Sequence, residues 1–173
     1  SSPESSKSAY KSYSIRNIQS ISQPVDLNLT DDYVATWTAR TGTDYYHFVI
    51  NYICNGNTYS YDWATSNCSP GSSNKCNSNS SGIMSYNLSN IIQSGYKHFG
   101  FDNIVVEVSF KVKAITYEEN VLYSSSEYSN LSNNIYYHPN GSTVIDSIIL
   151  SPVAPVLSVG KSIYIGKRIN PSS

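Results

Sequence analysis

Three aromatic side chains recur at every second position of one short segment, as Tyr59, Tyr61 and Trp63. Residues two apart lie on the same face of a β-strand, so the three rings would form a row. A row of exposed rings can stack on sugar faces, because each ring offers apolar area beside a polar edge. The interpretation that the sequence alone favours is that this face packs into the core. The alternative is that the row binds sugar, and on that alternative the row is the first candidate ligand-binding site.

Three further rings, Tyr96, Phe99 and Phe101, lie in the segment GYKHFGFD (95–102), which is predicted to be a long turn. Two of them are expected to cover an edge of the core. An exposed aromatic patch here would mark a contact site for a ligand or partner. Tyr96 and Phe99 therefore join the candidate ligand-binding residues.

Three cysteines are present, Cys54, Cys68 and Cys76, and their spacing does not match a zinc site. Cys68 and Cys76 flank a polar loop of seven residues. A disulfide that closes this loop would remove chain entropy worth roughly 2–3 kcal/mol. We predict that Cys68 and Cys76 form this disulfide and that Cys54 is half-buried at a strand end. Pairing of Cys54 with either of the other two is the alternative.

Acid–base and metal-binding side chains are few and scattered. His47, His98 and His138 are far apart in sequence, and we expect all three in solvent or in loops. No segment has the pattern of an activated nucleophile. The acidic pairs Asp31-Asp32 and Glu118-Glu119 fall at predicted turns and lack the spacing of a calcium loop. The sequence therefore predicts no catalytic residue, no metal site and no cofactor, and we expect that the protein is not an enzyme.

Composition restricts the kinds of partner. The chain has 173 residues, of which 13% are charged, and its formal net charge is -1. Nucleic-acid binding needs a basic field that displaces counterions from phosphates, so no nucleic-acid partner is expected. No apolar run approaches the roughly 18–20 residues of a membrane span, so membrane insertion is not expected either. The polar residues are mainly Ser, Asn, Thr and Tyr, which favours an extracellular or cell-surface location.

Apolar and polar residues alternate in short segments separated by turn signals, a pattern typical of an all-β sandwich or barrel. We predict an antiparallel two-sheet sandwich over residues 18–137. Asn55-Gly56 predicts a two-residue hairpin turn, because both residue types tolerate positive φ. Residues 66–82 are predicted to be a long loop and residues 89–94 a turn or a single helical turn, with no helix of ordinary length anywhere. The predicted strands lie at residues 18–29, 33–39, 45–54, 58–64, 83–88, 103–116 and 127–137.

Segments of different character flank the predicted sandwich. Residues 1–17 are rich in serine near their start and are predicted to be a linker or disordered tail. Residues 138–142 are predicted to be a second linker. Residues 143–173 are too few to bury a core of their own. They are expected either to dock on the sandwich as extra strands or to begin a truncated second β-module.

Five pieces of the central region, in the order of the chain, are ATWTA (35–39), YYHF (45–48), SYNLS (85–89), FKVKAI (110–115) and SEYS (126–129). With these pieces, residues 21–136 resemble a fibronectin type III domain of the kind found in secreted bacterial proteins. The resemblance implies an immunoglobulin-like two-sheet sandwich in which Trp37 fills the core. Relative to that pattern the loop between Cys68 and Cys76 is an insertion, and insertions are where a specific function would be placed.

The tail carries a second resemblance, through IDSIILSP (145–152) and LSVGKS (157–162). These pieces resemble the first strands of a bacterial immunoglobulin-like (group 2) domain. Such domains commonly follow one another along surface proteins and adhesins, so the resemblance implies a monomeric module within a multidomain chain.

These observations together predict a non-catalytic extracellular module for adhesion, display or spacing in a larger bacterial surface or secreted protein. Its partner would be a glycan or a protein on a host or substrate surface. The alternative is a carbohydrate-binding module accessory to a glycoside hydrolase, with Tyr59, Tyr61 and Trp63 as its platform.

Overall fold

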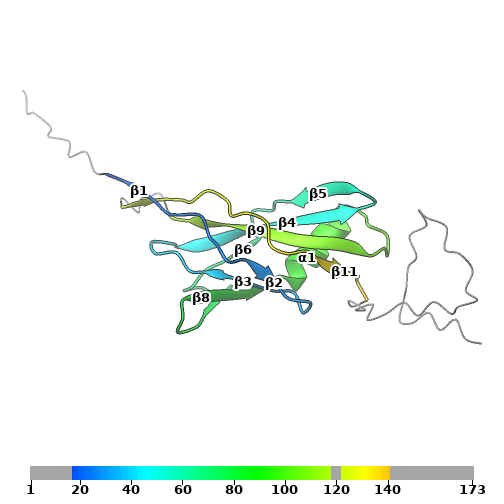
Figure 1. Cartoon of the computed structure of the whole chain (residues 1–173), viewed down its shortest axis with the longest axis horizontal. Coiled ribbons are helices and arrows are strands. Elements are labelled where there is room, and N and C mark those ends of the chain that lie inside the picture. The colour runs from blue at the N-terminus through cyan, green and yellow to red at the C-terminus, as the bar shows by residue number, and fades with distance from the viewer. Residues whose placement is uncertain (1–16, 118–121, 141–173) are drawn as a thin grey trace, which may run out of the picture.

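The computed structural model describes residues 17–117 and 122–140. The predicted truncated module at 143–173 lies outside this part of the chain, as does the predicted N-terminal linker apart from Asn17. The described residues form a sandwich of two antiparallel sheets with one α-helix, α1, beside them (Figure 1). The predicted all-β, antiparallel two-sheet fold class is therefore confirmed.

The larger sheet is built around two ten-residue strands, β4 (Tyr45–Cys54) and β9 (Val106–Ile115), the smaller sheet has strands of two to five residues, and a small parallel pair lies near the N-terminal end. The larger sheet has the order β11 (Ile135–Tyr137), β9, β4 and β5 (Asn57–Tyr61), with β6 (Asn67–Cys68) also paired to β4. The smaller sheet has the order β2 (Asn28–Leu29), β3 (Val34–Thr38), β8 (Ile83–Asn87) and β7 (Asn77–Ser78). The parallel pair is β1 (Gln19–Ser20) with β10 (Tyr123–Ser124).

The core lies between the two sheets and is centred on Trp37. Burial alternates along β3, and Trp37 and Ala35 are fully buried there. The Trp37 ring meets Tyr46 and Phe48 of β4 edge to face, with ring centroids 5.0 and 5.3 Å apart. Such aromatic contacts stabilise the core beyond the apolar area they bury. The expectation that Trp37 fills the core is confirmed.

The hairpin between β4 and β5 turns at Asn55 and Gly56, whose φ angles are 50° and 77°. Positive φ at both central positions is the requirement of the turn that matches the twist of paired strands. The predicted hairpin is therefore confirmed. Its register places Tyr59 opposite Tyr52 and Tyr61 opposite Ile50.

The predicted strand at 127–137 is a regular strand only from Ile135. Before it, residues 126–132 lie along β9 with a three-residue period, and we call them the serine-paired segment. Three serines there each donate a backbone N–H to a β9 carbonyl and accept the N–H of that same β9 residue on the side-chain hydroxyl. The pairs are Ser126 with Ala114, Ser129 with Val112, and Ser132 with Phe110, and all six distances are 2.8–3.0 Å.

The expectation that the chain contains no helix of ordinary length is wrong. The helix α1 spans Ser89–His98, so it includes the predicted single turn and half of the predicted long turn. Its buried residues, Ile92, Gly95 and Tyr96, are spaced to share one helical face. Tertiary burial of that face stabilises the helix despite the absence of a side-chain cap at Leu88.

Two other predicted segments differ from the structure in detail. Residues 18–29 form two short strands, β1 and β2, because Pro24 and the positive φ of Asp26 (58°) interrupt regular pairing between them. The predicted loop at 66–82 is long, but it contains the short strands β6 and β7.

Candidate functional site

The aromatic row of Tyr59, Tyr61 and Trp63 is divided between the core and the surface. Tyr59 and Tyr61 lie on β5 and are half-buried. Trp63 follows the end of β5 and is 53% exposed. The favoured prediction of a core face therefore holds for the inner end of the row and is wrong for Trp63.

The inner end of the row is supported from below by α1 and the residues that follow it. The ring of Tyr59 lies 5.4 Å from that of Phe99 and 5.0 Å from that of Phe101. Phe99 is half-buried, and Tyr96 is only 5% exposed, with its hydroxyl donating to the carbonyl of Ile104. The prediction of Tyr96 as a ligand-binding residue is therefore not supported, because the ring lies in the core.

The outer end of the row, which we call the aromatic shelf, consists of half-buried Tyr61, exposed Trp63 and the exposed His98 of α1. The rings of Tyr61 and Trp63 are parallel within 3°, with centroids 6.3 Å apart. The exposed His98 ring of α1 lies 5.6 Å from Tyr61 and 6.5 Å from Trp63. Two parallel aromatic faces with a polar ring beside them are suited to stacking on a partly apolar, partly polar ligand.

Gly95 allows α1 to lie close enough to place this shelf. A Cβ atom at Gly95 would stand 2.3 Å from the Tyr52 hydroxyl and 2.8 Å from the Tyr61 ring. The same Tyr52 hydroxyl donates a 2.7 Å hydrogen bond to the carbonyl of Ile92 in α1. Burial, followed by the nearby Tyr137 and Tyr61 hydroxyls, raises the pKa of Tyr52 well above its ordinary value. The Tyr52 hydroxyl therefore keeps its proton to a higher pH than an exposed tyrosine, and it continues to donate that proton to the Ile92 carbonyl of α1.

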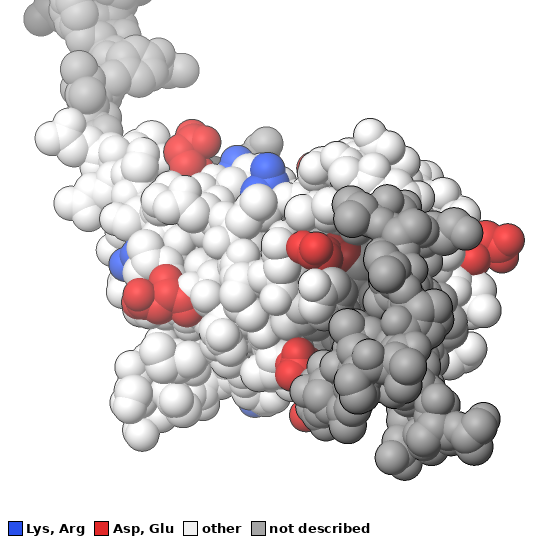
Figure 2. Space-filling view, turned by 45° about the vertical axis from the view of Figure 1, so that its right-hand side comes forward, with Lys and Arg blue, Asp and Glu red and all other residues white. Residues whose placement is uncertain are grey.

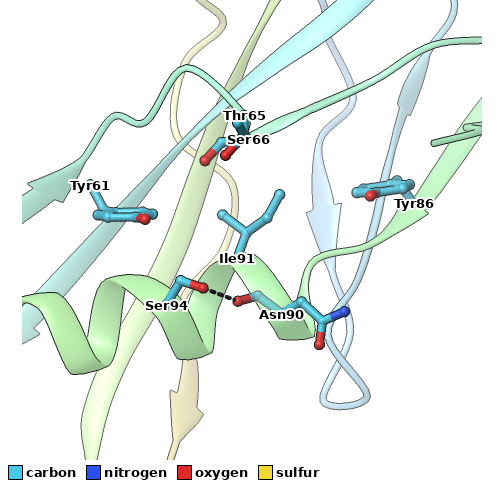
Figure 3. A pocket seen from close by; sticks show the side chains of 7 residues that line it. All are labelled: Tyr61, Thr65, Ser66, Tyr86, Asn90, Ile91 and Ser94. Atoms are coloured by element: carbon cyan, nitrogen blue, oxygen red, sulfur yellow. Dashed lines mark hydrogen bonds between the residues drawn. The ribbon is translucent and has the colours of Figure 1, made fainter.

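A pocket adjoins the shelf and shares Tyr61 with it. Its volume is about 230 Å³, and Figure 3 shows Tyr61 and Tyr86 on opposite sides of it with Ile91 between them. Every residue that lines it is uncharged: Tyr61, Thr65, Ser66, Tyr86, Asn90, Ile91 and Ser94. Apart from Tyr61, none of these residues was predicted from the sequence to belong to a site, because they come from α1, β8 and the segment between β5 and β6.

The loop that reaches Tyr86 is closed by a disulfide. Cys68 and Cys76 are bonded, with Cα atoms 5.4 Å apart, and Cys54 is a free, buried cysteine. Within this loop, Asn74 accepts a hydrogen bond from the Tyr86 hydroxyl and donates one to the carbonyl of Asn67. The predicted Cys68–Cys76 pairing is thus the pairing in the structure. This disulfide closes the loop whose Asn74 contacts Tyr86, a residue that lines the pocket.

A cluster of polar side chains lies on the outer face of the larger sheet. His47 Nε2 and Asp62 Oδ1 are 2.6 Å apart, and the His47 ring lies 6.4 Å from that of Tyr128. The ammonium groups of Lys111 and Lys113 lie 4.7 and 5.5 Å from the centre of the Tyr128 ring. Burial, and then the negative Asp62, raise the pKa of Tyr128. Cation–π contacts and the hydrogen bond between His47 and Asp62 give these side chains structural partners.

The three histidines are not brought together. His138 lies in the loop that follows β11, as predicted, but it is buried at 3% exposure and its Nε2 is 3.1 Å from the carbonyl of Asn103. His47, His98 and His138 contribute to three different contacts. Within residues 17–117 and 122–140, no group of three or more His, Cys, Asp or Glu side chains could hold a metal ion.

The charged side chains are dispersed over the surface. Acidic side chains are spread over the face shown in Figure 2, and few Lys or Arg side chains appear there. None of the helices that the structure describes has the length and apolar character needed to span a membrane.

The aromatic shelf and the adjoining pocket are therefore the best-defined candidate site. Comparisons of the chain with protein-family models, curated proteins and solved structures found no match.

Proposed function

We propose that this chain is a non-catalytic extracellular module that binds a neutral saccharide on the aromatic shelf. In this role it serves adhesion or display within a larger bacterial surface or secreted protein. The observation that carries the proposal is the 53% exposure of Trp63 with its ring parallel to that of Tyr61. The resemblance to fibronectin type III and bacterial immunoglobulin-like domains supports the extracellular, modular part.

The chemistry of the shelf favours a sugar over a charged ligand. A pyranose ring has an apolar face that can cover aromatic area, and hydroxyls at its rim that need polar partners. The shelf supplies parallel rings, and the residues beside it supply hydroxyl and amide groups without charge. The low content of charged residues, 13%, gives no electrostatic attraction for a nucleic acid or an anionic polymer.

The test is binding of wild type and Trp63→Ala to a glycan array and to insoluble polysaccharides. We expect wild type to be retained by at least one saccharide and Trp63→Ala to lose about tenfold or more in affinity, because it removes the larger stacking surface. Tyr136→Ala is the matched control, since Tyr136 is 62% exposed on β11 and outside the shelf. Equal binding by Trp63→Ala and wild type, or no retention of wild type by any glycan, would contradict the proposal.

The same shelf would serve a carbohydrate-binding module attached to a glycoside hydrolase. The two roles differ in the source of the sugar, so the array and the polysaccharides distinguish them. Retention by host-cell glycans supports adhesion, whereas retention only by cellulose, chitin or xylan supports the accessory role.

A further inference from the structure

The pocket beside the shelf has the size and chemistry of a site for a single sugar ring. Its volume of about 230 Å³ is below the roughly 300–1,000 Å³ typical of pockets for drug-sized ligands. Two tyrosine rings and Ile91 provide apolar area, and Thr65, Ser66 and Ser94 provide hydroxyls. Because no lining residue is charged, the ligand that matches this pocket is neutral.

The pocket and the shelf are continuous through one residue. Tyr61 lines the pocket and also lies parallel to Trp63 on the shelf. A saccharide chain that spans the shared Tyr61 would place one unit in the pocket and a neighbouring unit on the shelf. A monosaccharide, in contrast, would occupy only one of them.

The wall opposite Tyr61 is held in place by two contacts. The ring of Tyr86 stacks on Phe48, with centroids 5.7 Å apart and planes within 9°. Its hydroxyl donates to Oδ1 of Asn74, whose Nδ2 donates to the carbonyl of Asn67. Asn74 is held in turn by the loop that the Cys68–Cys76 disulfide closes.

We infer that the pocket is a second saccharide subsite, one sugar ring in size, and that Asn74 in the disulfide-closed loop positions its wall through Tyr86. The inference rests on the proposed function, because it adds a subsite to the shelf. Asn74 is a positioning residue, since it acts on the ligand through the Tyr86 ring. The ligand is then a neutral oligosaccharide with one unit in the pocket and the next on the shelf.

The first test compares ligand lengths by calorimetry, with mono-, di- and oligosaccharides of glucose, galactose, mannose and N-acetylglucosamine. In wild type, affinity should rise from the monosaccharide to the disaccharide as a second ring reaches Trp63. Trp63→Ala should remove that increase, so that the variant binds the monosaccharide and the disaccharide with similar affinity. Tyr86→Ala should weaken monosaccharide binding about tenfold, because one aromatic wall is lost.

The second test isolates the hydrogen bond between the loop and the wall. Tyr86→Phe removes its donor and Asn74→Ala its acceptor, and each should weaken disaccharide binding about three- to tenfold. The double variant should be no weaker than either single one, because both changes remove the same interaction. Asn74→Asp keeps an acceptor for Tyr86 but sets a carboxylate oxygen against the carbonyl of Asn67, so it should not restore wild-type affinity. Ser73→Ala, in the same loop, is the control and should bind as wild type does.

A third readout needs no ligand. The ring signals of Tyr86 in NMR spectra should shift in Asn74→Ala and on reduction of the disulfide, while those of Trp37 in the core stay unchanged. Unchanged Tyr86 signals in both cases overturn the positioning role of the loop, even if saccharides bind.

The binding outcomes separate the two proposals. If Trp63→Ala loses oligosaccharide binding while Tyr86→Ala, Tyr86→Phe and Asn74→Ala bind as wild type does, the shelf is the whole site and the subsite is refuted. If wild type binds none of these saccharides, both the proposed function and the subsite are refuted.

Discussion

At the scale of single residues, Gly95 decides how closely α1 approaches the larger sheet. Alanine is normally better than glycine inside a helix by about 1 kcal/mol. Here the added Cβ would lie 2.3 Å from the Tyr52 hydroxyl, whose position the hydrogen bond to Ile92 fixes. The steric conflict is therefore expected to outweigh the helix propensity.

We predict that Gly95→Ala lowers the free energy of unfolding by about 1–3 kcal/mol, measured by urea denaturation. Gln93→Ala, at an exposed position of the same helix, is the control and should change stability little. A gain in stability for Gly95→Ala would show that α1 can move away from Tyr52 at no cost.

Tyr52 also makes the free energy of unfolding depend on pH in the alkaline range. Burial raises its pKa in the folded state, whereas in the unfolded chain it titrates near the ordinary value of 10.0. Above that pH the unfolded state therefore loses a proton that the folded state keeps, and stability falls as pH rises. Each such tyrosine contributes a slope of at most about 1.4 kcal/mol per pH unit.

We predict that the free energy of unfolding of wild type is level up to about pH 9 and declines above about pH 10. Tyr52→Phe should decline less steeply, although it starts lower because the bond to Ile92 is lost. Identical slopes for the two proteins above pH 10 would mean that Tyr52 does not control the alkaline loss. Burial also raises the pKa of Tyr137, so the slope of the variant should not reach zero.

At the scale of elements, the serine-paired segment replaces a regular edge strand. Ser129 is buried, and its hydroxyl accepts the N–H of Val112 at 3.0 Å while its own N–H donates to the carbonyl of Val112 at 2.9 Å. Alanine at this position would leave the Val112 N–H buried without an acceptor. The cost of such an unsatisfied donor is about 1–3 kcal/mol.

We predict that Ser129→Ala lowers the free energy of unfolding by that amount and speeds hydrogen exchange at the Val112 amide. Ser22→Ala, at an exposed serine near the N-terminal end, should change neither quantity. Unaltered exchange at Val112 in Ser129→Ala would show that the hydroxyl is not the acceptor that protects this amide.

The elements differ in how far sequence predicts them. The bounds of β4 agree with the predicted strand at 45–54, because alternation and the Asn55-Gly56 turn act in the same direction. The helix α1 was missed because it contains Gly95 and has Leu88, whose side chain cannot cap, at its N-cap position, although Ile92, Gly95 and Tyr96 have helical spacing. The serine-paired segment repeats every third residue, which matches neither the period of a strand nor that of a helix.

The candidate site shows the same division. The row of Tyr59, Tyr61 and Trp63 follows from strand alternation, which is local. Which end of the row is exposed depends on where α1 packs, and the wall at Tyr86 depends on its contacts with Phe48 and Asn74. Contacts between segments this far apart in the chain leave no periodic signal in a single sequence.

At the scale of the whole molecule, the small net charge of -1 and the uncharged pocket predict how saccharide affinity depends on salt concentration. Affinity for a neutral saccharide should change less than twofold between about 0.05 M and about 0.5 M NaCl, because no ion pair is screened. Calorimetry at both salt concentrations checks this. A large loss of affinity at high salt would instead indicate a charged ligand.

The short parallel pair β1–β10 has a mechanical consequence. In Figure 1, β1 and β11 lie towards opposite ends of the described part of the chain. Tension applied between them would pull β1 and β10 past each other in shear, because the two strands run in the same direction. The bonds from the Gln19 and Ile21 amides to the carbonyls of Leu122 and Ser124 would then share the load instead of breaking one after another.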